Sequence, residues 1–586
     1  MSVNLEAFRE KIFKYALANA VKYNGKAKVE PVISKFLGEH RELRSRAREV
    51  IALVEKIVEE VNSLTLIDQK RILEERFPEL LVEEKPKERR FKLPPLPNAD
   101  KYSTIVTRYA PNPDFVLHFG QARAIYLSHD YARMYKGVFI LRFEDTDPRI
   151  KKPRIDFYDA IREDLIWLGC RWDKEYIQSK RLEIYYDIAR KLIEIGGAYV
   201  CVCKPDKFRS YIRSSKPCPC RDLAVEDHME RFDRMLEGVY KEGESVLRVK
   251  TDLSHPNPSV RDWVALRVID TKLHKHPIVG DRYDVWPTYN FAAGIDDHLM
   301  EVTHIIRGKE FLVGVEKQLY MYRWLGWEYP ECIHYGKWLM IGSGTMSKSK
   351  MLRDLQLGLY KSWDDPRLPT LAALRRRGIQ PEAIHRMVLE LGVKMSEVRF
   401  SWENLYAHNR RIIDPITRRF FYVEDPIKLK VRSIPLNEVV ARIPFHPDRE
   451  DMGYRETRIK VKDGEIELYI SKRDYDILAS GRIVRLIGLF NVRPISLSGD
   501  SVEAVWHSRA YEEAAKLKAR LIHWVPIENA VPIRVVMPDA SESTGYGENL
   551  CRTIALGEVI QFERFGFAKF DSKLSDGTMI FYYTHD

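Results

Sequence analysis

Residues 103–143 constrain the fold more than any other part of this sequence. Residues 103–108 are rich in β-branched side chains and predict a buried strand, and residues 138–143 predict a second one. Between them, apolar side chains recur at helical spacing through residues 121–135, and Gly137 supplies a helix stop. A strand, a helix and a strand within so short a stretch form a βαβ unit, whose strands run parallel. The sequence therefore predicts an α/β fold with a doubly wound parallel sheet.

The remaining segments differ in hydrophobic periodicity and in predicted secondary structure, and they predict further domains. Helical spacing dominates the N-terminal part, alternating short strands dominate the C-terminal part, and residues 371–391 read as helix broken near Gly378 and Pro381. Residues 458–470 alternate around Asp463-Gly464 and predict a β-hairpin. The predicted domains are a helical appendage with its linker (1–100), the first half of the α/β domain (101–200), an insertion with a cysteine cluster (201–285), the second half of the α/β domain (286–350), a helical domain (351–408) and β-barrels (409–586).

Charge and cysteine content narrow the class of protein. Lys and Arg number 96 against 85 Asp and Glu, and the net charge of +11 favours a polyanionic partner such as nucleic acid, although a highly charged surface alone would explain it equally well. No apolar run approaches the ~20 residues of a membrane-spanning helix, and the first thirty residues do not resemble a signal peptide. Four of the seven cysteines lie close together, so a reducing cytoplasm is the expected location.

Two segments carry the chemistry of nucleotide binding. Residues 108–123 connect the first predicted strand to the following helix, where ligands of doubly wound sheets bind. There Gly120 permits close approach of the backbone to phosphates, and His118 can donate a hydrogen bond to charge that develops on them. Residues 344–350 place Lys348 among small residues, which suits a mobile loop that neutralises a triphosphate, although a solvated lysine loop is the alternative.

Together these segments resemble the HIGH and KMSKS signatures of class I aminoacyl-tRNA synthetases. Residues 141–149 (LRFEDTDPR) and 287–311 (PTYNFAAGIDDHLMEVTHIIRGKEF) resemble motifs of the glutamyl and glutaminyl branch. The resemblance covers about residues 103–586, and residues 557–569 (GEVIQFERFGFAK) resemble the anticodon-binding barrels of archaeal and eukaryotic members. It implies that 201–285 binds the acceptor end of tRNA, that 351–408 contacts its stem and that 409–586 binds the anticodon.

The resemblance also implies roles for individual residues. His118, Gln121 and Lys348 are the expected catalytic residues. The expected ATP-binding residues are Pro111, His118, Gly120, Gln121, Met346, Ser347 and Lys348. The sequence departs from the signatures at two positions: Gln121 replaces the final histidine of the first, and Thr345 replaces the first lysine of the second.

The expected glutamate-binding residues are Arg108, Glu144, Tyr289 and Arg307. Arg307 matches the position at which the family reads the substrate side chain. A guanidinium pairs with a carboxylate through two charge-assisted hydrogen bonds and cannot accept from an amide, so Arg307 favours glutamate over glutamine. Glu144 matches the residue that holds the substrate ammonium.

Cys201, Cys203, Cys218 and Cys220 form two pairs separated by fourteen residues. Paired thiolates on either side of a loop can bind a structural, tetrahedral zinc ion, although the alternative of four reduced, partly buried cysteines stays open.

The segment 409–422 interleaves arginines with aromatic residues and is a candidate RNA-binding segment. Its expected tRNA-binding residues are Arg410, Arg411, Arg418 and Arg419; a solvated strand edge is the alternative. The three arginines at 375–377 are expected to be either solvated or in contact with the tRNA backbone.

The resemblance implies an enzyme that activates glutamate with ATP and Mg²⁺ and transfers it to the tRNA for glutamate. Whether the tRNA for glutamine is also charged stays open, no membrane contact is expected, and a monomer is favoured. Three alternatives remain: a glutaminyl enzyme, against which Arg307 argues; a catalytically silent tRNA-binding relative, which Gln121 and Thr345 motivate; and a small-molecule nucleotidyltransferase, which would not need the large basic β-rich half.

Overall fold

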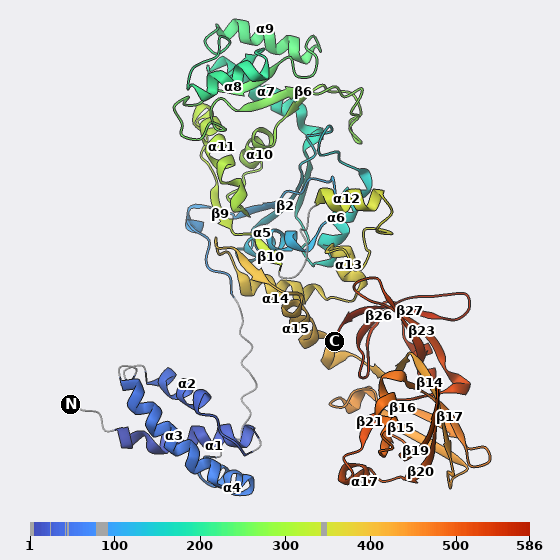
Figure 1. Cartoon of the computed structure of the whole chain (residues 1–586). Coiled ribbons are helices and arrows are strands. Elements are labelled where there is room, and N and C mark those ends of the chain that lie inside the picture. Colours follow the sequence, from blue (N-terminus) through green and yellow to red (C-terminus); the bar gives the residue numbers. More distant parts are fainter. Residues whose placement is uncertain (1–4, 24, 41–42, 44–45, 78–91, 341–347) are drawn as a thin grey trace. The chain divides into compact units, whose positions relative to one another are not determined.

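The computed structural model describes residues 5–23, 25–40, 43, 46–77, 92–340 and 348–586. The chain separates into two compact units, Met1–Arg90 and Phe91–Asp586 (Figure 1). The first unit holds four α-helices that bury one shared apolar core. These helices are α1 (Arg9–Lys22), α2 (Val29–Glu39), α3 (Ala47–Ser63) and α4 (Leu66–Arg76). Among the helices within the described ranges, none combines the length and apolar character needed to cross a bilayer.

The second unit contains the predicted parallel sheet. Its first βαβ unit is confirmed: β1 pairs in parallel with β2, and α5 connects them. A second parallel pair, β8 and β9, lies against β1, where the Thr303 amide donates to the Val106 carbonyl at 3.0 Å. The elements of this core are β1 (Val106–Tyr109), α5 (Ala122–Met134), β2 (Val138–Phe143), α6 (Ile155–Trp167), β3 (Lys174–Ile177), α10 (Tyr289–Leu299), β8 (His304–Gly308), α11 (Leu312–Leu325) and β9 (Glu331–Tyr335).

An antiparallel sheet interrupts this α/β pattern between β3 and α10. Its four strands follow one another in chain order and pack against the helices around them. The elements are α7 (Leu182–Glu194), β4 (Ala198–Cys201), α8 (Pro205–Arg213), α9 (Val225–Leu236), β5 (Val246–Val249), β6 (Val264–Val268) and β7 (Val285–Pro287). Because the sheet is antiparallel, it forms a local substructure inserted between the two halves of the parallel core.

Four helices connect the parallel core to the β-rich region: α12 (Lys348–Gln356), α13 (Leu371–Arg376), α14 (Pro381–Leu391) and α15 (Trp402–Ile413). Two short strands, β10 (Trp338–Met340) and β11 (Val398–Phe400), pair beside them. The predicted break at Gly378 and Pro381 is confirmed, since α13 ends before the first and α14 begins at the second. Gly378 has φ +89°, and a Cβ there would lie 2.9 Å from Thr584 Oγ1, so both conformation and space require glycine.

The arginines at 375–377 differ in their surroundings: Arg375, whose side chain is 34 % exposed, lies 3.8 Å from Asp164 and 3.9 Å from Glu163, whereas the other two contact the β-rich region. Arg376 forms a two-pronged ion pair with Asp571 at 2.9 and 3.1 Å, and Arg377 donates to the carbonyls of Tyr583 and Thr584. Arg376 and Arg377 therefore connect the end of α13 to the last strands of the chain. No local sequence pattern indicates this contact.

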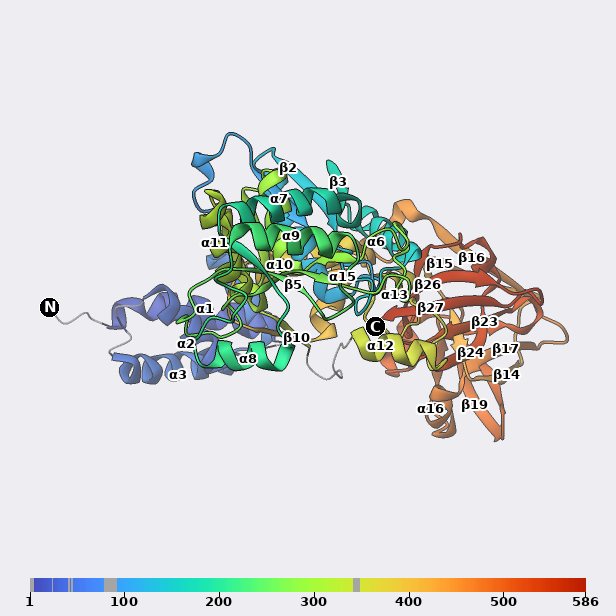
Figure 2. The same ribbon diagram turned by 90° about the horizontal axis from the view of Figure 1, so that it is seen from above.

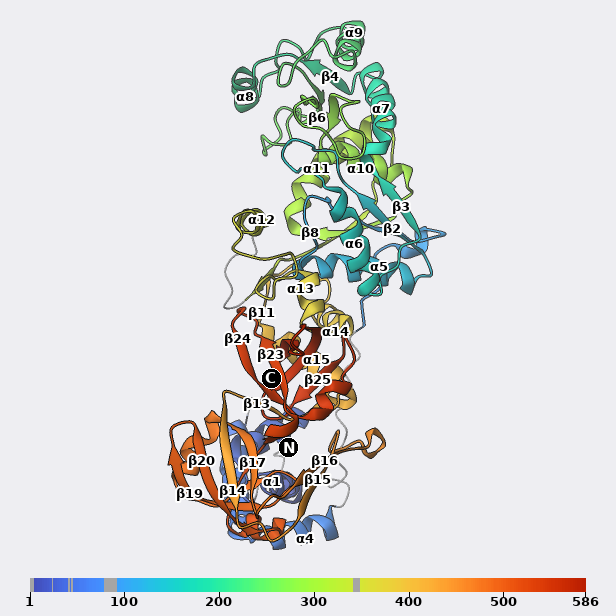
Figure 3. The ribbon, with the colours of Figure 1, turned by 90° about the vertical axis from the view of Figure 1, so that its right-hand side faces the viewer.

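Two seven-stranded sheets and one two-stranded sheet make up the described β-rich region. In the first, β26, β27, β23 and β24 lie side by side (Figure 2), and in the second β19, β20, β14 and β17 do (Figure 3). The first sheet contains β12 (Arg419–Phe420), β25 (Val559–Phe562), β26 (Gly566–Lys573), β27 (Met579–His585), β23 (Val531–Val536), β24 (Glu542–Gly547) and β13 (Tyr422–Glu424). The second contains β21 (Arg520–Ile522), β18 (Val484–Leu486), β19 (Asn491–Ser498), β20 (Ser501–Ser508), β14 (Pro426–Arg432), β17 (Ile466–Ser471) and β22 (Val525–Pro526).

The hairpin predicted over residues 458–470 is wrong, although its turn forms. Asp463 and Gly464 have φ values of 52° and 75°, as a tight reversal requires. However, β16 (Tyr454–Lys460) pairs with β15 (Glu438–Pro444), whereas β17 pairs with β14. The alternating pattern of each strand is satisfied equally well by either partner, so the local sequence does not decide the pairing.

A buried histidine links the two large sheets and should make stability depend on pH. His523 is fully buried, its Nε2 donates to the Tyr422 carbonyl at 2.7 Å, and its Nδ1 accepts from Arg564 at 3.1 Å. Burial first, then the charges of Arg564 and Arg473, lower its pKa to about 4, while Asp474 opposes the shift. The neutral ring is therefore built into the folded state.

We expect acid to destabilise the fold through His523. Because the folded pKa lies below the unfolded value, the unfolded chain takes up the proton first, and stability falls as the pH drops from about 6.5 to about 4. The expected loss is about 3 kcal/mol. Urea unfolding across this range, in the wild type and in His523→Gln, measures it. A variant whose stability falls as steeply with pH as the wild type would contradict the assignment.

Candidate active site

A cleft of about 1120 Å³ opens where β1, β2 and β8 end. Ligands of open parallel sheets bind at this edge. The structure brings eight predicted residues together in its lining, although they are spread over two hundred positions of sequence: Arg108, Pro111, His118, Gly120, Gln121, Glu144, Tyr289 and Arg307. Because these residues come from both halves of the interrupted sheet, only the folded chain assembles the cleft.

Gln121, which departs from the signature, has a structural role at this turn. It ends a short 3₁₀ helix, Phe119–Gln121, whose cap is reciprocal. The Gln121 Oε1 accepts from the His118 amide at 3.0 Å, and its Nε2 donates to the Tyr109 hydroxyl at 3.1 Å. An amide side chain can accept and donate at once, so glutamine fixes the start of the loop to the end of β1.

The His118 ring is oriented by the same turn. Its Nδ1 accepts from the Gly120 amide at 3.1 Å, so the neutral imidazole carries its proton on Nε2. A Cβ on Gly120 would lie 3.0 Å from the His118 ring, which gives this glycine a packing role in addition to the predicted close approach. The flanking backbone is held by residues far along the chain: Phe119 donates to the Pro369 carbonyl at 2.8 Å, and Leu371 donates to the Leu117 carbonyl at 3.0 Å.

The second signature is only partly within the described residues. Thr345, Met346 and Ser347 lie outside them, and Lys348 is the first residue of α12.

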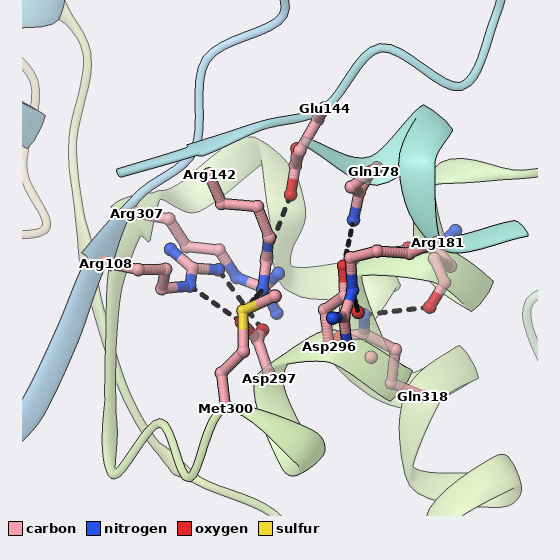
Figure 4. Close-up of polar contacts among 12 residues, drawn as sticks. Arg108, Arg142, Glu144, Gln178, Arg181, Asp296, Asp297, Met300, Arg307 and Gln318 are labelled. Atoms are coloured by element: carbon pink, nitrogen blue, oxygen red, sulfur yellow. Dashed lines mark hydrogen bonds and ion pairs between the residues drawn. The ribbon is translucent and has the colours of Figure 1, made fainter. Parts of the chain in front are cut away.

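The floor of the cleft is a buried network of charges (Figure 4). Asp297, at 1 % exposure, pairs with Arg108 Nε at 3.0 Å and with Arg142 Nη1 at 2.8 Å. Arg142 also donates to Glu144 at 2.9 Å. Arg307 stands beside this network and completes a group of three guanidinium groups and two carboxylates, with a formal charge of +1.

The two carboxyl groups differ in how well they are compensated. Burial raises the pKa of Asp297, but Arg108 and Arg142 outweigh it and hold the pKa below its ordinary value. Burial also raises the pKa of Glu144, and its arginine neighbours do not offset the rise. Arg142 therefore compensates the Glu144 carboxylate incompletely, and an ammonium group in the cleft would stabilise its ionised form further.

Of the three guanidinium groups, Arg307 is the one with no carboxylate at ion-pair distance among the described residues. Its side chain is 5 % exposed, and Nη2 donates to the Tyr329 hydroxyl at 3.1 Å. Neither Nε nor Nη1 has a hydrogen-bond partner among the described residues. A buried guanidinium without an anionic partner is costly, so this position in the cleft favours a ligand carboxylate.

Sequence reasoning missed Asp297 and Arg142, which organise this network. A signal was present for each: Arg142 lies within a predicted buried strand, and Asp297 is the second of two adjacent aspartates that follow an apolar run. Charged residues in such positions are rare unless they are paired. The other aspartate, Asp296, accepts from Gln178, Arg181 and Tyr185 and ties α10 to α7.

The four predicted metal ligands are brought together in the inserted sheet. Cys201 ends β4, and the Sγ atoms of Cys201, Cys203, Cys218 and Cys220 all lie within 4.8 Å of one another. The Cys201–Cys218 and Cys203–Cys220 sulfur separations are 3.9 and 3.8 Å. These are too long for disulfides and match the spacing of about 3.8 Å that Zn–S bonds of about 2.3 Å give in a tetrahedron.

The candidate RNA-binding segment is not an aromatic platform. Phe420, Phe421 and Tyr422 are at most 1 % exposed and pack in the cores of the β-rich region, so they cannot stack on bases. Of the arginines, Arg418 pairs with Glu558 at 2.9 Å and Arg419 with Asp414 at 3.3 Å. Arg410 pairs with Asp586, and Arg411 is exposed at the end of α15.

Comparison with known proteins agrees with this arrangement. Residues 104–415 match the catalytic domain of the class I tRNA synthetases (E and Q), and residues 417–508 and 521–571 match anticodon-binding domains of the same group. The chain is 49 % identical to the glutamate–tRNA ligase of Pyrococcus furiosus, over 98 % of each protein. It is 47 % identical to that of Hyperthermus butylicus, over 97 % of this chain and the whole of the relative. The chain therefore belongs to the class I tRNA synthetases of the glutamyl and glutaminyl group.

Proposed function

We propose that this protein is a glutamate–tRNA ligase, which activates glutamate with ATP and transfers it to the 3′ end of tRNA. The observation that carries the proposal is the buried Arg307, whose Nε and Nη1 lack acceptors inside a network of net charge +1. Glutamate, with two carboxylates and one ammonium, has a net charge of −1 and neutralises this network. Glutamine is neutral overall and would leave a buried charge unpaired.

The geometry of the cleft supports an arrangement of both substrates. Glu144 holds the ammonium of glutamate, since its carboxylate lacks a second cation, and Arg307 pairs with the side-chain carboxylate. The Nε2–H of His118 lies on the signature turn, where it can donate to the phosphates of ATP while charge develops on them. Glutamate then attacks the α-phosphate, and pyrophosphate leaves. Lys348 and Mg²⁺ would balance the charge of the triphosphate.

Aminoacylation with purified tRNAs tests the proposal. The tRNA for glutamate and the tRNA for glutamine are each offered labelled glutamate or labelled glutamine, with ATP and Mg²⁺. We expect glutamate to be attached to the tRNA for glutamate and glutamine to neither tRNA. The second tRNA shows whether the enzyme discriminates between the two. Attachment of glutamine would overturn the role of Arg307, and attachment of neither amino acid by folded, tRNA-binding protein would favour the silent relative.

We also propose that the four clustered cysteines hold a structural zinc ion. The sulfur separations of 3.8 and 3.9 Å support a tetrahedral site that joins the end of β4 to the loop after α8. The metal would cross-link two segments that otherwise share a small apolar cluster.

Cys218→Ser should abolish zinc binding and lower the thermal midpoint of the inserted sheet, because a tetrahedral thiolate site tolerates hydroxyl ligands poorly. Metal analysis of freshly purified, unchelated protein gives the stoichiometry, with Cys551→Ser as the matched control because Cys551 is buried in another core. Protein that contains no zinc, or a Cys218→Ser variant that retains it, would reject the site.

A further inference from the structure

A chain of three hydrogen bonds connects Arg307 to Tyr329 and Gln318, two residues that do not line the cleft. Arg307 Nη2 donates to the Tyr329 hydroxyl at 3.1 Å, and this hydroxyl donates to Gln318 Oε1 at 2.6 Å. Gln318 Nε2 donates in turn to the Asn290 carbonyl at 3.0 Å. Gln318 is fully buried in α11, and Asn290 lies in the first turn of α10, next to Tyr289.

Each proton in this chain has a single possible place. The Asn290 carbonyl can only accept, so it turns the NH₂ end of Gln318 toward itself and the oxygen end toward Tyr329. That oxygen requires a donor, and the Tyr329 hydroxyl has one proton to give. Burial raises the pKa of Tyr329, which keeps the hydroxyl protonated. The hydroxyl therefore presents only a lone pair to Arg307.

Side-chain packing holds the hydrogen-bonded residues in position. The Tyr329 ring meets the edge of Tyr322 at a centroid distance of 4.8 Å, and the Tyr322 hydroxyl donates to the Gly294 carbonyl at 2.7 Å. A Cβ on Gly294 would lie 3.2 Å from Gln318 Nε2, so glycine lets α10 and α11 approach closely enough for the amide to reach Asn290.

We propose that Tyr329 and Gln318 are positioning residues for glutamate recognition. Tyr329 accepts from one N–H of Arg307 Nη2 and fixes the plane of the guanidinium, so that the remaining N–H groups stay directed to the ligand carboxylate. Gln318 fixes the direction of the Tyr329 hydroxyl. The inference rests on the proposed function, because it takes Arg307 as the group that reads the substrate. Neither residue touches the ligand in this arrangement, and both act through Arg307.

The test compares Tyr329→Phe, Gln318→Met and the double variant in steady-state aminoacylation. Tyr329→Phe should raise the KM for glutamate about tenfold, the size expected when a hydrogen bond to a charged group is lost, with the KM for ATP and kcat changed less than about twofold. Gln318→Met should act in the same direction. The double variant should be no worse than Tyr329→Phe, because both changes break one chain. Tyr186→Phe is the matched control, since its buried hydroxyl donates to the Val285 carbonyl elsewhere.

The outcomes separate this inference from the proposed function. A glutamate KM that is unchanged in Tyr329→Phe but strongly raised in Arg307→Gln overturns the positioning role alone. An unchanged KM in both variants overturns the role of Arg307 itself. Equal losses toward glutamate and ATP, or losses that add in the double variant, would show that the residues only support the core. If Tyr329→Phe does not fold, Gln318→Met decides by the same KM criterion.

Discussion

Arg307→Gln should lower kcat/KM for glutamate about a thousandfold and leave the KM for ATP within about twofold of wild type. The variant removes a buried cation that faces the ligand carboxylate, and breaking a buried, hydrogen-bonded charge pair costs about 3–5 kcal/mol. Such a loss corresponds to a factor of hundreds to thousands in kcat/KM. The proposed ATP contacts are on the signature turn and not on Arg307, so ATP binding should be spared.

Arg162→Gln supplies the matched control for this experiment. Arg162 pairs with Asp159 on α6 and with Glu175 on β3. Its side chain is partly exposed and does not line the cleft, so its loss should change the kinetics less than about twofold. Aminoacylation at varied glutamate and at varied ATP gives both constants. Glutamate kinetics that match wild type in Arg307→Gln would refute the assignment of the carboxylate site.

Asp297→Asn should lower the free energy of unfolding by about 3–5 kcal/mol. The change is nearly isosteric, but it leaves Arg108 and Arg142 buried with a neutral partner where each now has an anion at 3.0 and 2.8 Å. Because two cations lose the same carboxylate, the effect should exceed that of any exposed ion pair in the chain.

Denaturant titration measures this loss as the change in the unfolding transition of the second unit, Phe91–Asp586. Asp156→Asn is the control: its pair with Arg154 at 2.6 Å is about half exposed, and exposed pairs contribute about 0–1 kcal/mol. If both variants unfold at the same denaturant concentration, the buried network does not hold the sheet together as we infer.

Local patterns predicted the parts of the fold whose cause is local. The βαβ unit, the break at Gly378 and Pro381 and the turn at Asp463-Gly464 follow from strand composition, helical spacing and turn chemistry, and all are present. The partners of β16 and β17 were not predictable in the same way. β16 pairs with the strand before it, β15, whereas β17 pairs with the more distant β14, and this choice follows from how the sheets pack.

The candidate RNA-binding segment, residues 409–422, shows that local sequence is equally insufficient to predict a site. Arginine beside phenylalanine is compatible with base stacking and with a strand that buries its rings and pairs its cations. Burial of Phe420, Phe421 and Tyr422 decides for the second, and burial depends on what covers the strand. The local sequence identifies these residues, but it does not show which other residues cover them.

For this protein, the sequence by itself determined the βαβ unit and the four paired thiols, because each is a pattern of residue types at short spacing, and the family resemblance pointed to the signature turn and to Arg307. Only the tertiary structure decided the surroundings of Arg307: Asp297 pairs with its neighbours Arg108 and Arg142, while the Tyr329 hydroxyl accepts from its guanidinium and donates to Gln318. The physical reason is that charge and hydrogen-bond direction at a buried site depend on groups that are close in space. Here those groups come from segments that lie between Arg108 and Tyr329, more than two hundred residues apart in sequence.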